Sequence, residues 1–331
     1  MKHLIKKMLI LTALLSVNVS VYAYDFIVGG IKYNILTKST CEVATGMNSI
    51  FTNDYKGKTF VIPPQVEYRG NQYTVTAISN YAFQKAEISE IIIPETITKI
   101  RLGAFEWSYL QRISLPSSLS EIPTNAFNRC KSLYYVKIPN GITEIGSSAF
   151  EECTRLPSID IPNTVTEISG FAFSDCTTLS SVSIGNSIKY IYYCAFTGCH
   201  NITKITIHNP TPPKIICGDD SDVFQGITYL TATLYVPKGA LDAYRNAPYW
   251  SKFESIKELE NSGIENVSAN PINVRVRNGG ISVSGLDRKV TIEVYNTNGQ
   301  LVYCGTETTI SVPTKGIYIV RVAGQTFKVV I

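Results

Sequence analysis

One pattern recurs between Val75 and His208 with almost no drift in spacing. It reads apolar-x-x-[I/L/V]-x-[I/L]-P, two turn residues, [V/I/L]-[T/S/K]-x-I, four spacers and Ala-Phe. Successive copies lie 22 or 23 residues apart, measured at Phe83, Phe105, Phe127, Phe150, Phe173 and Phe196. A fixed period in the low twenties indicates a solenoid, in which each coil returns the backbone to the same place in cross-section before climbing one step.

Each copy should contribute one layer to a shared core, because a single coil cannot bury its own apolar side. We therefore expect the phenylalanines to form one buried ladder. A second ladder should consist of Ile93, Leu115, Ile138, Ile161, Ile184 and Ile207. The stretch that ends in Ile-Pro predicts a strand, V-T-x-I a second short strand, and Ala-Phe a brief helical turn.

The motif also resembles a known repeat. Its fullest copy is Leu133-x-x-Val136-x-Ile138-Pro139-x-x-Ile142-Thr143-Glu144-Ile145-Gly146-x-x-Ala149-Phe150-x-x-Cys153. This copy closely resembles the BspA-like leucine-rich repeat of bacterial surface proteins, and the resemblance covers roughly residues 24–260. It implies a mainly β leucine-rich repeat solenoid of about 23 residues per repeat. It also implies a surface or secreted binding protein, often described as an adhesin, without implying a ligand.

Residues 1–23 read as a secretory signal peptide, with a basic start, an apolar run, and Val21 and Ala23 at the minus-three and minus-one positions. The alternative is an uncleaved membrane anchor, which polar residues near the end of an already short run disfavour. Without the three leader lysines, 27 basic residues face 26 acidic ones, a net charge of +1. This balance does not indicate a nucleic-acid partner.

Four further segments follow the leader. Residues 24–72 are rich in short strands and Gly turns and predict an N-terminal cap, followed by the leucine-rich repeats over 73–208. Residues 209–260 predict a degenerate last repeat, with Val223-Phe224 in place of Ala-Phe, and a C-terminal cap closed by aromatic residues. Residues 261–331 have many alternating strands and a hairpin turn at Asn298-Gly299, which predict a small β-sandwich.

This last segment carries a second resemblance. Asn270-Pro271, Val294–Val302 and Lys315–Val322 resemble the C-terminal sorting domain of the type IX secretion system. The resemblance implies export across the outer membrane by the type IX machinery, after which the domain is removed or attached there.

Four cysteines recur at intervals of 23 residues, at Cys130, Cys153, Cys176 and Cys199. A disulfide or metal site is one reading of such a set in an exported protein. However, earlier coils hold Ala86 and Ser108 at this position, and side chains in a line do not converge on a tetrahedral metal. We therefore expect stacked buried thiols. A disulfide between Cys194 and Cys217 stays open.

The sequence predicts no catalytic site, no metal site and no cofactor. Cys199-His200 lacks a third group to orient the pair, and neighbouring side chains point apart. The acidic run Asp219-Asp220-Ser221-Asp222 lacks the alternating ligands and the Gly of a calcium loop, so we interpret it as a solvated insertion.

The outward side of the repeat strands is the candidate binding surface. It presents two columns of side chains, one with Glu90, Arg112, Tyr135, Ser158, Ser181 and Lys204, the other with Ile92, Ser114, Lys137, Asp160, Ser183 and Thr206. Arg112, Tyr135, Lys137 and Asp160 should lie side by side across coils about 4.8 Å apart, and Arg and Tyr often dominate interfaces. We assign partner binding to these four with Glu90 and Lys204. An ordinary solvated sheet face is the alternative.

These features favour an exported, non-catalytic repeat protein at the cell surface or outer membrane, or secreted. It would bind a protein or glycan, such as a component of the host extracellular matrix, through the strand face. A passive structural spacer of the cell envelope is the first alternative, and a hydrolase of unrecognised type is the second.

Overall fold

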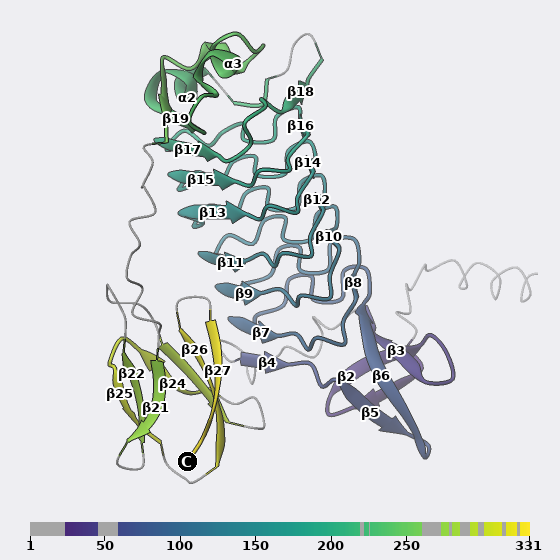
Figure 1. The fold of residues 1–331 in the computed structure, drawn as a ribbon. Coiled ribbons are helices and arrows are strands. Elements are labelled where there is room, and N and C mark those ends of the chain that lie inside the picture. Colours follow the sequence, from purple (N-terminus) through teal and green to yellow (C-terminus); the bar gives the residue numbers. More distant parts are fainter. Residues whose placement is uncertain are drawn as a thin grey trace, which may run out of the picture. The chain divides into compact units, whose positions relative to one another are not determined.

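The computed structural model describes residues 24–45, 59–218, 222–224, 226–259, 273–277, 280–284, 292–296, 301–312, 316–322 and 325–331. The predicted signal peptide, residues 219–221 of the acidic run, the start of residues 261–331 and the Asn298-Gly299 turn lie outside these residues. The chain forms two compact units, residues 1–259 and 260–331 (Figure 1).

The first unit is the predicted solenoid, and parallel strands run along one side of it (Figure 1). They are β4 (Thr59–Val61), β7 (Glu90–Ile92), β9 (Arg112–Ser114), β11 (Tyr135–Lys137), β13 (Ser158–Ile161), β15 (Ser181–Ile184), β17 (Lys204–Ile207), β19 (Thr233–Val236) and β20 (Ser255–Glu258). We call the outward side of these strands the strand face. Equivalent residues pair from coil to coil, as Ile113 does with Val136, so the sequence repeat sets the register.

A second series of parallel strands lies on the other side of the coils (Figure 1). It comprises β8 (Lys99–Ile100), β10 (Glu121–Ile122), β12 (Glu144–Ile145), β14 (Glu167–Ile168), β16 (Tyr190–Tyr192) and β18 (Lys214–Ile216). The second short strand that V-T-x-I predicts is therefore confirmed. The inward isoleucine of each V-T-x-I, such as Ile145 and Ile168, is fully buried.

The Ala-Phe segment forms tight turns, so the predicted helical turn is wrong. Each coil places residues two before and two after its Phe in the left-handed region, as at Ser148 (φ 53) and Glu152 (φ 54). These residues and Phe150 donate their N–H groups to the next coil, over 2.7–3.0 Å. A non-glycine residue in this region costs about 1–2 kcal/mol. The hydrogen bonds between coils compensate that cost, because buried N–H groups need partners.

The predicted phenylalanine ladder is confirmed. Phe127, Phe150 and Phe173 are fully buried, and successive rings are stacked with centroids 5.2 Å apart. The ladder ends as expected at Phe224, 5.3 Å from Phe196. The ladder of Ile93, Leu115, Ile138, Ile161, Ile184 and Ile207 is buried as well.

The N-terminal cap is a sheet in the order β1-β2-β3-β6-β5. Its strands are β1 (Phe26–Val28), β2 (Ile31–Ile35), β3 (Thr40–Val43), β5 (Gln65–Tyr68) and β6 (Asn71–Ile78). β4, with residues 59–61, lies in the segment predicted as the N-terminal cap but pairs with β7, so the first strand of the strand face precedes residue 73. The β5–β6 hairpin separates β4 from the rest of its coil and so hides this first repeat in the sequence.

The C-terminal cap contains α2 (Gly226–Thr231), α3 (Leu241–Arg245), η2 (Trp250–Lys252) and the last strand, β20. The expected aromatic closure is present, since Tyr244, Trp250 and Phe253 are buried. Phe253 and Trp250 contact the end of the phenylalanine ladder at Phe224, with centroids 5.5 and 6.2 Å away.

The second unit is a small β domain with a core of its own. One sheet has the order β21-β22-β25 and the other β24-β23-β26-β27. The strands are β21 (Asn273–Arg277), β22 (Gly280–Ser284), β23 (Ile292–Asn296), β24 (Leu301–Gly305), β25 (Thr309–Ser311), β26 (Ile317–Val322) and β27 (Gln325–Val330). Ile281 and Ile310 of the first sheet share one core with Val294 and Val320 of the second, which agrees with the predicted sandwich.

Candidate functional site

The strand face consists of two sheets. The first has the order β4-β7-β9-β11 and the second begins at β13. In other coils the residue before the strand donates its N–H to the preceding coil, as Tyr134 does to Gln111 and Ser180 to Pro157, both over 2.9 Å. Pro157 holds this position before β13 and has no N–H. The pairing between β11 and β13 is therefore lost.

Glu90, Arg112 and Tyr135, three of the predicted binding residues, lie side by side on the first sheet. Arg112 Nε is 3.4 Å from Glu90 Oε1, and its guanidinium lies 6.0 Å from the ring centroid of Tyr135. Thr59 donates a hydrogen bond of 3.0 Å to Glu90 Oε2. These contacts cross four neighbouring strands and hold Arg112 in one orientation.

Lys137 belongs to this group, but Asp160 and Lys204 do not. Lys137 follows Tyr135 by two residues on β11, so both side chains point outward. Asp160 lies on β13, which contacts β11 but does not pair with it, so the adjacency of Asp160 to Lys137 stays a prediction. Lys204, on β17, lies 5.4 Å from the ring of Tyr235 instead. Four of the six residues predicted to bind a partner therefore lie on β7, β9 and β11.

Exposed aromatic residues also lie outside the strands of these coils. Tyr134 is 43% exposed and Tyr135 45%, while Tyr109 and Trp107 in the preceding coil are 58% and 38% exposed. Tyr134 comes directly before β11, Trp107 ends the turn before β9, and Tyr109 lies between that turn and β9. Because only strand positions were considered as binding residues, the sequence prediction missed all three. An alignment of the coils with attention to large apolar residues at variable positions would have found them.

Trp107 is the centre of a charged cluster on the turn side of the solenoid. The guanidinium of Arg129 lies 4.6 Å from its ring centroid, and Lys131 Nζ lies 5.9 Å away. Both cations also pair with Glu152, over 2.8 and 3.1 Å. Burial acts to raise the pKa of Glu152, but the hydrogen bonds and charges of Lys131 and Arg129 outweigh it and hold that pKa below its usual range.

The cysteine column forms the expected stack of buried, unbonded thiols. Each thiol donates to the carbonyl of the Phe one coil earlier, as Cys153 Sγ does to Phe127 over 3.3 Å. Burial raises the pKa of Cys130 to about 12 and that of Cys153 well above its ordinary value. These thiols stay protonated at neutral pH and are poor nucleophiles. Cys194 and Cys217 do not form a disulfide with each other.

The described residues do not form the clusters typical of a metal site or of a cysteine nucleophile. Within them, no three His, Cys, Asp or Glu side chains gather as a metal site would require. Cys199 is buried while His200 is exposed, so the pair does not form a nucleophile with its base. No helix in the described ranges has the length and apolar character needed to cross a bilayer.

Three solved structures illustrate what the chain is similar to. A leucine-rich repeat protein from Bacteroides ovatus ATCC 8483 is 21% identical, over 71% of this chain and 77% of that one, with a TM-score of 0.37. The T. pallidum leucine rich repeat protein is 20% identical, over 68% and 96% of the two chains, with a TM-score of 0.39. A leucine rich cell surface protein from Faecalibacterium prausnitzii A2-165 is 15% identical, over 75% and 97%, with a TM-score of 0.25.

No curated protein sequence matches the chain significantly. A family described as BspA type leucine rich repeat region matches in six copies, over residues 48–169, 76–203 and 144–233, which together span more than half of the chain. The match includes the region of β4 and the whole strand face from β7 to β17. The chain therefore belongs to the BspA type leucine-rich repeat family.

Proposed function

We propose that this protein is displayed at the cell surface or secreted and binds a macromolecular partner, a protein or a glycan of the host surface, through the strand face around β9 and β11. Leucine-rich repeat proteins are typically binding or structural proteins rather than enzymes. The observation that carries the proposal is the group of Arg112, Tyr135 and Lys137, cationic and aromatic side chains on consecutive strands of a parallel sheet, with the exposed Tyr134 directly before β11.

The residue types and their support suit an interface. Tyr and Arg are the residues whose truncation most often weakens protein complexes. The salt bridge to Glu90 and the ring of Tyr135 hold Arg112 in place, so its ordering costs little entropy when a partner binds. The strands belong to a stacked core, so the surface is formed before binding.

Capture with the purified chain tests the proposal. The chain is immobilised, extracellular matrix proteins and mucin glycans are passed over it, and Kd is measured for any partner retained. Tyr135→Ala, Arg112→Ala and Lys137→Ala should each weaken binding, with Tyr135→Ala costing about 2 kcal/mol, roughly thirtyfold in Kd.

Ser181→Ala is the matched control, because Ser181 holds the position of Tyr135 two coils further along, on the second sheet. It should bind like the unmodified chain. Unchanged Kd in all three test variants would remove the strand face from the proposal. A deletion strain that attaches normally would favour a passive envelope spacer instead.

We further propose that residues 1–23 direct export and that the second unit serves as a type IX sorting domain. The basic and apolar pattern of the leader and the motifs within residues 264–331 support this proposal, as does the separate core of the second unit. Intact mass of protein recovered from the cell surface should lack residues 1–23. Deletion of residues 260–331 should leave the solenoid folded but trapped inside the cell, and normal surface display of that variant would contradict the sorting role.

A further inference from the structure

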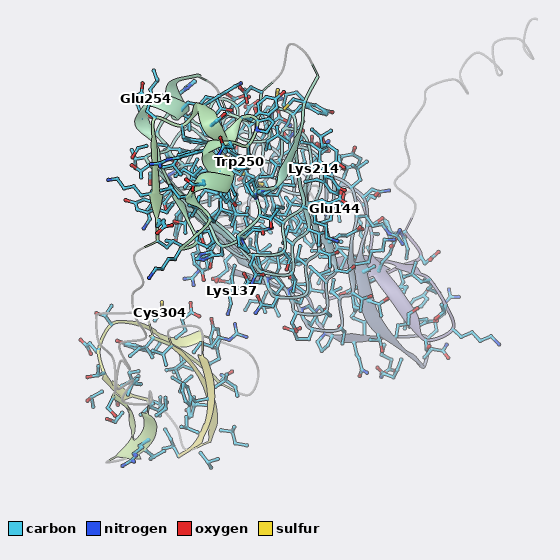
Figure 2. All side chains as sticks on the ribbon, turned by 45° about the horizontal axis from the view of Figure 1, so that its top comes forward. Lys137, Glu144, Lys214, Trp250, Glu254 and Cys304 are labelled. Atoms are coloured by element: carbon cyan, nitrogen blue, oxygen red, sulfur yellow. The ribbon has the colours of Figure 1, made fainter. Side chains whose placement is uncertain are left out.

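A groove of about 680 Å³ opens on the side of the solenoid opposite the strand face, where β16 and β18 end the second strand series. Its lining includes Asn186, Lys189 and Tyr190 from one coil and Asn209, Thr211 and Lys214 from the next. Figure 2 labels Lys214 here, with Glu144 on an earlier strand of the same series. The volume is typical of ligand sites, which span about 300–1,000 Å³.

The loop that shapes the groove is fixed from both sides. Asn209 Nδ2 donates to the Ile188 carbonyl over 2.7 Å, and Asn209 Oδ1 accepts from the Thr211 N–H over 2.9 Å. From the C-terminal cap, the buried Tyr244 and Trp250 donate to the carbonyls of Asn209 and Pro213, both over 2.8 Å. A ligand therefore meets a site that is already formed, which lowers the cost of binding.

The charged side chains that line the groove are all positive. Lys189 and Lys214 are exposed, and neither forms an ion pair with any residue that the structure describes. The residues that line the groove include no carboxylate. Towards the N-terminal coils, Glu121, Glu144 and Glu167 stand in register on β10, β12 and β14. An anionic ligand would be repelled from that end and attracted to the two lysines.

The other lining groups suit a sugar ring. Tyr190 presents a half-buried aromatic ring, with its centroid 6.5 Å from that of Tyr192, and such a ring can pack against the C–H face of a pyranose. Asn186 Oδ1 accepts from Ser187 over 3.2 Å, which leaves its Nδ2 as a donor for a ligand hydroxyl. Thr211 adds an exposed hydroxyl.

We propose that this groove binds an acidic saccharide, a pyranose that carries a carboxylate, with the carboxylate between Lys189 and Lys214 and the ring against Tyr190. Two sources share this chemistry, sialylated and uronic-acid glycans. The site lies on a different sheet from the strand face, so it is independent of the function proposed above.

Calorimetric titration of the full chain tests the proposal with 3′-sialyllactose in one arm and trigalacturonic acid in the other. Lactose serves as the neutral counterpart of the first. At least one acidic sugar should bind saturably and lactose at least tenfold more weakly. An exposed ion pair is worth about two- to fivefold in affinity, so Lys189→Gln and Lys214→Gln should each weaken binding by about that factor and the double variant by about tenfold.

The matched control is Lys99→Gln, because Lys99 is the exposed first residue of β8, the position that Lys214 holds on β18, but it lies outside the groove. It should leave affinity unchanged, and thermal unfolding should show that all variants are folded. The proposal is overturned if neither acidic sugar binds, if lactose binds equally well, or if the double lysine variant binds as the control does. Strand-face variants should retain sugar binding, so the two proposals can fail separately.

Discussion

Phe150 provides the sharpest test of how the solenoid is held together. Its ring is fully buried and stacks on Phe127 and Phe173 at 5.2 Å on either side. Replacing a buried Phe by Ala costs about 3–5 kcal/mol. Two stacked contacts worth about 0.5–1.5 kcal/mol each are lost with it, so Phe150→Ala should lower the free energy of unfolding by about 4 kcal/mol.

The position of Phe150 makes a second consequence measurable. The stack of Phe150 on Phe173 joins the coil of β11 to that of β13, where the strand face has no pairing. In a repeat array, stability is a sum of terms between neighbouring coils. Loss of the stack at this junction should therefore let the N-terminal and C-terminal coils unfold separately.

Urea unfolding followed by circular dichroism, with hydrogen exchange read by mass spectrometry, measures both effects. Phe196→Ala is the matched control, since Phe196 is equally buried and stacks at 5.2 and 5.3 Å, but in coils joined by continuous strand pairing. Phe150→Ala should give two transitions and Phe196→Ala one. A loss below about 1 kcal/mol, or identical transitions in the two variants, would refute the reasoning.

Three further predictions follow from particular contacts. Tyr33→Phe should raise the free energy of unfolding by about 1–2 kcal/mol in urea titrations, because the buried Tyr33 hydroxyl has no hydrogen-bond partner among the described residues; a destabilised variant would contradict this. Stability should fall as pH rises from about 9, where the thiol of an unfolded chain ionises, to about 12, the raised pKa of Cys130. Cys130→Ala should reduce that fall in pH-dependent melting, and an unchanged profile would exclude the thiol as its cause. Pro157→Ser restores an N–H before β13, so hydrogen exchange at Tyr135–Lys137 and Ser158–Ile161 should slow; unchanged exchange would show that the proline does not cause the divided sheet.

The repeat spacing was sufficient to predict the solenoid, its register and its buried ladders. Equivalent residues recur every 22 or 23 positions, and a coil of constant length must place Phe150 beside Phe127 and Phe173. The small residue three positions after each Phe and the aromatic closure at Trp250 were predictable for the same reason, since each packs against a neighbour of known type. Alternation of apolar residues likewise predicted most strands of the second unit.

The finer geometry of the coils depends on contacts between segments that are distant in the sequence. The local sequence does not predict that Ser148 and Glu152 adopt the left-handed conformation. Their backbone strain is compensated only by hydrogen bonds to the next coil. Strand pairing needs an N–H from every coil, so Pro157 leaves β11 and β13 unpaired and divides the strand face into two sheets. The groove depends on residues distant in sequence, because Trp250 holds Pro213 in place. Local pattern fixes how the coils repeat, while contacts between distant segments fix where the repeat is interrupted, and the candidate sites lie at those interruptions.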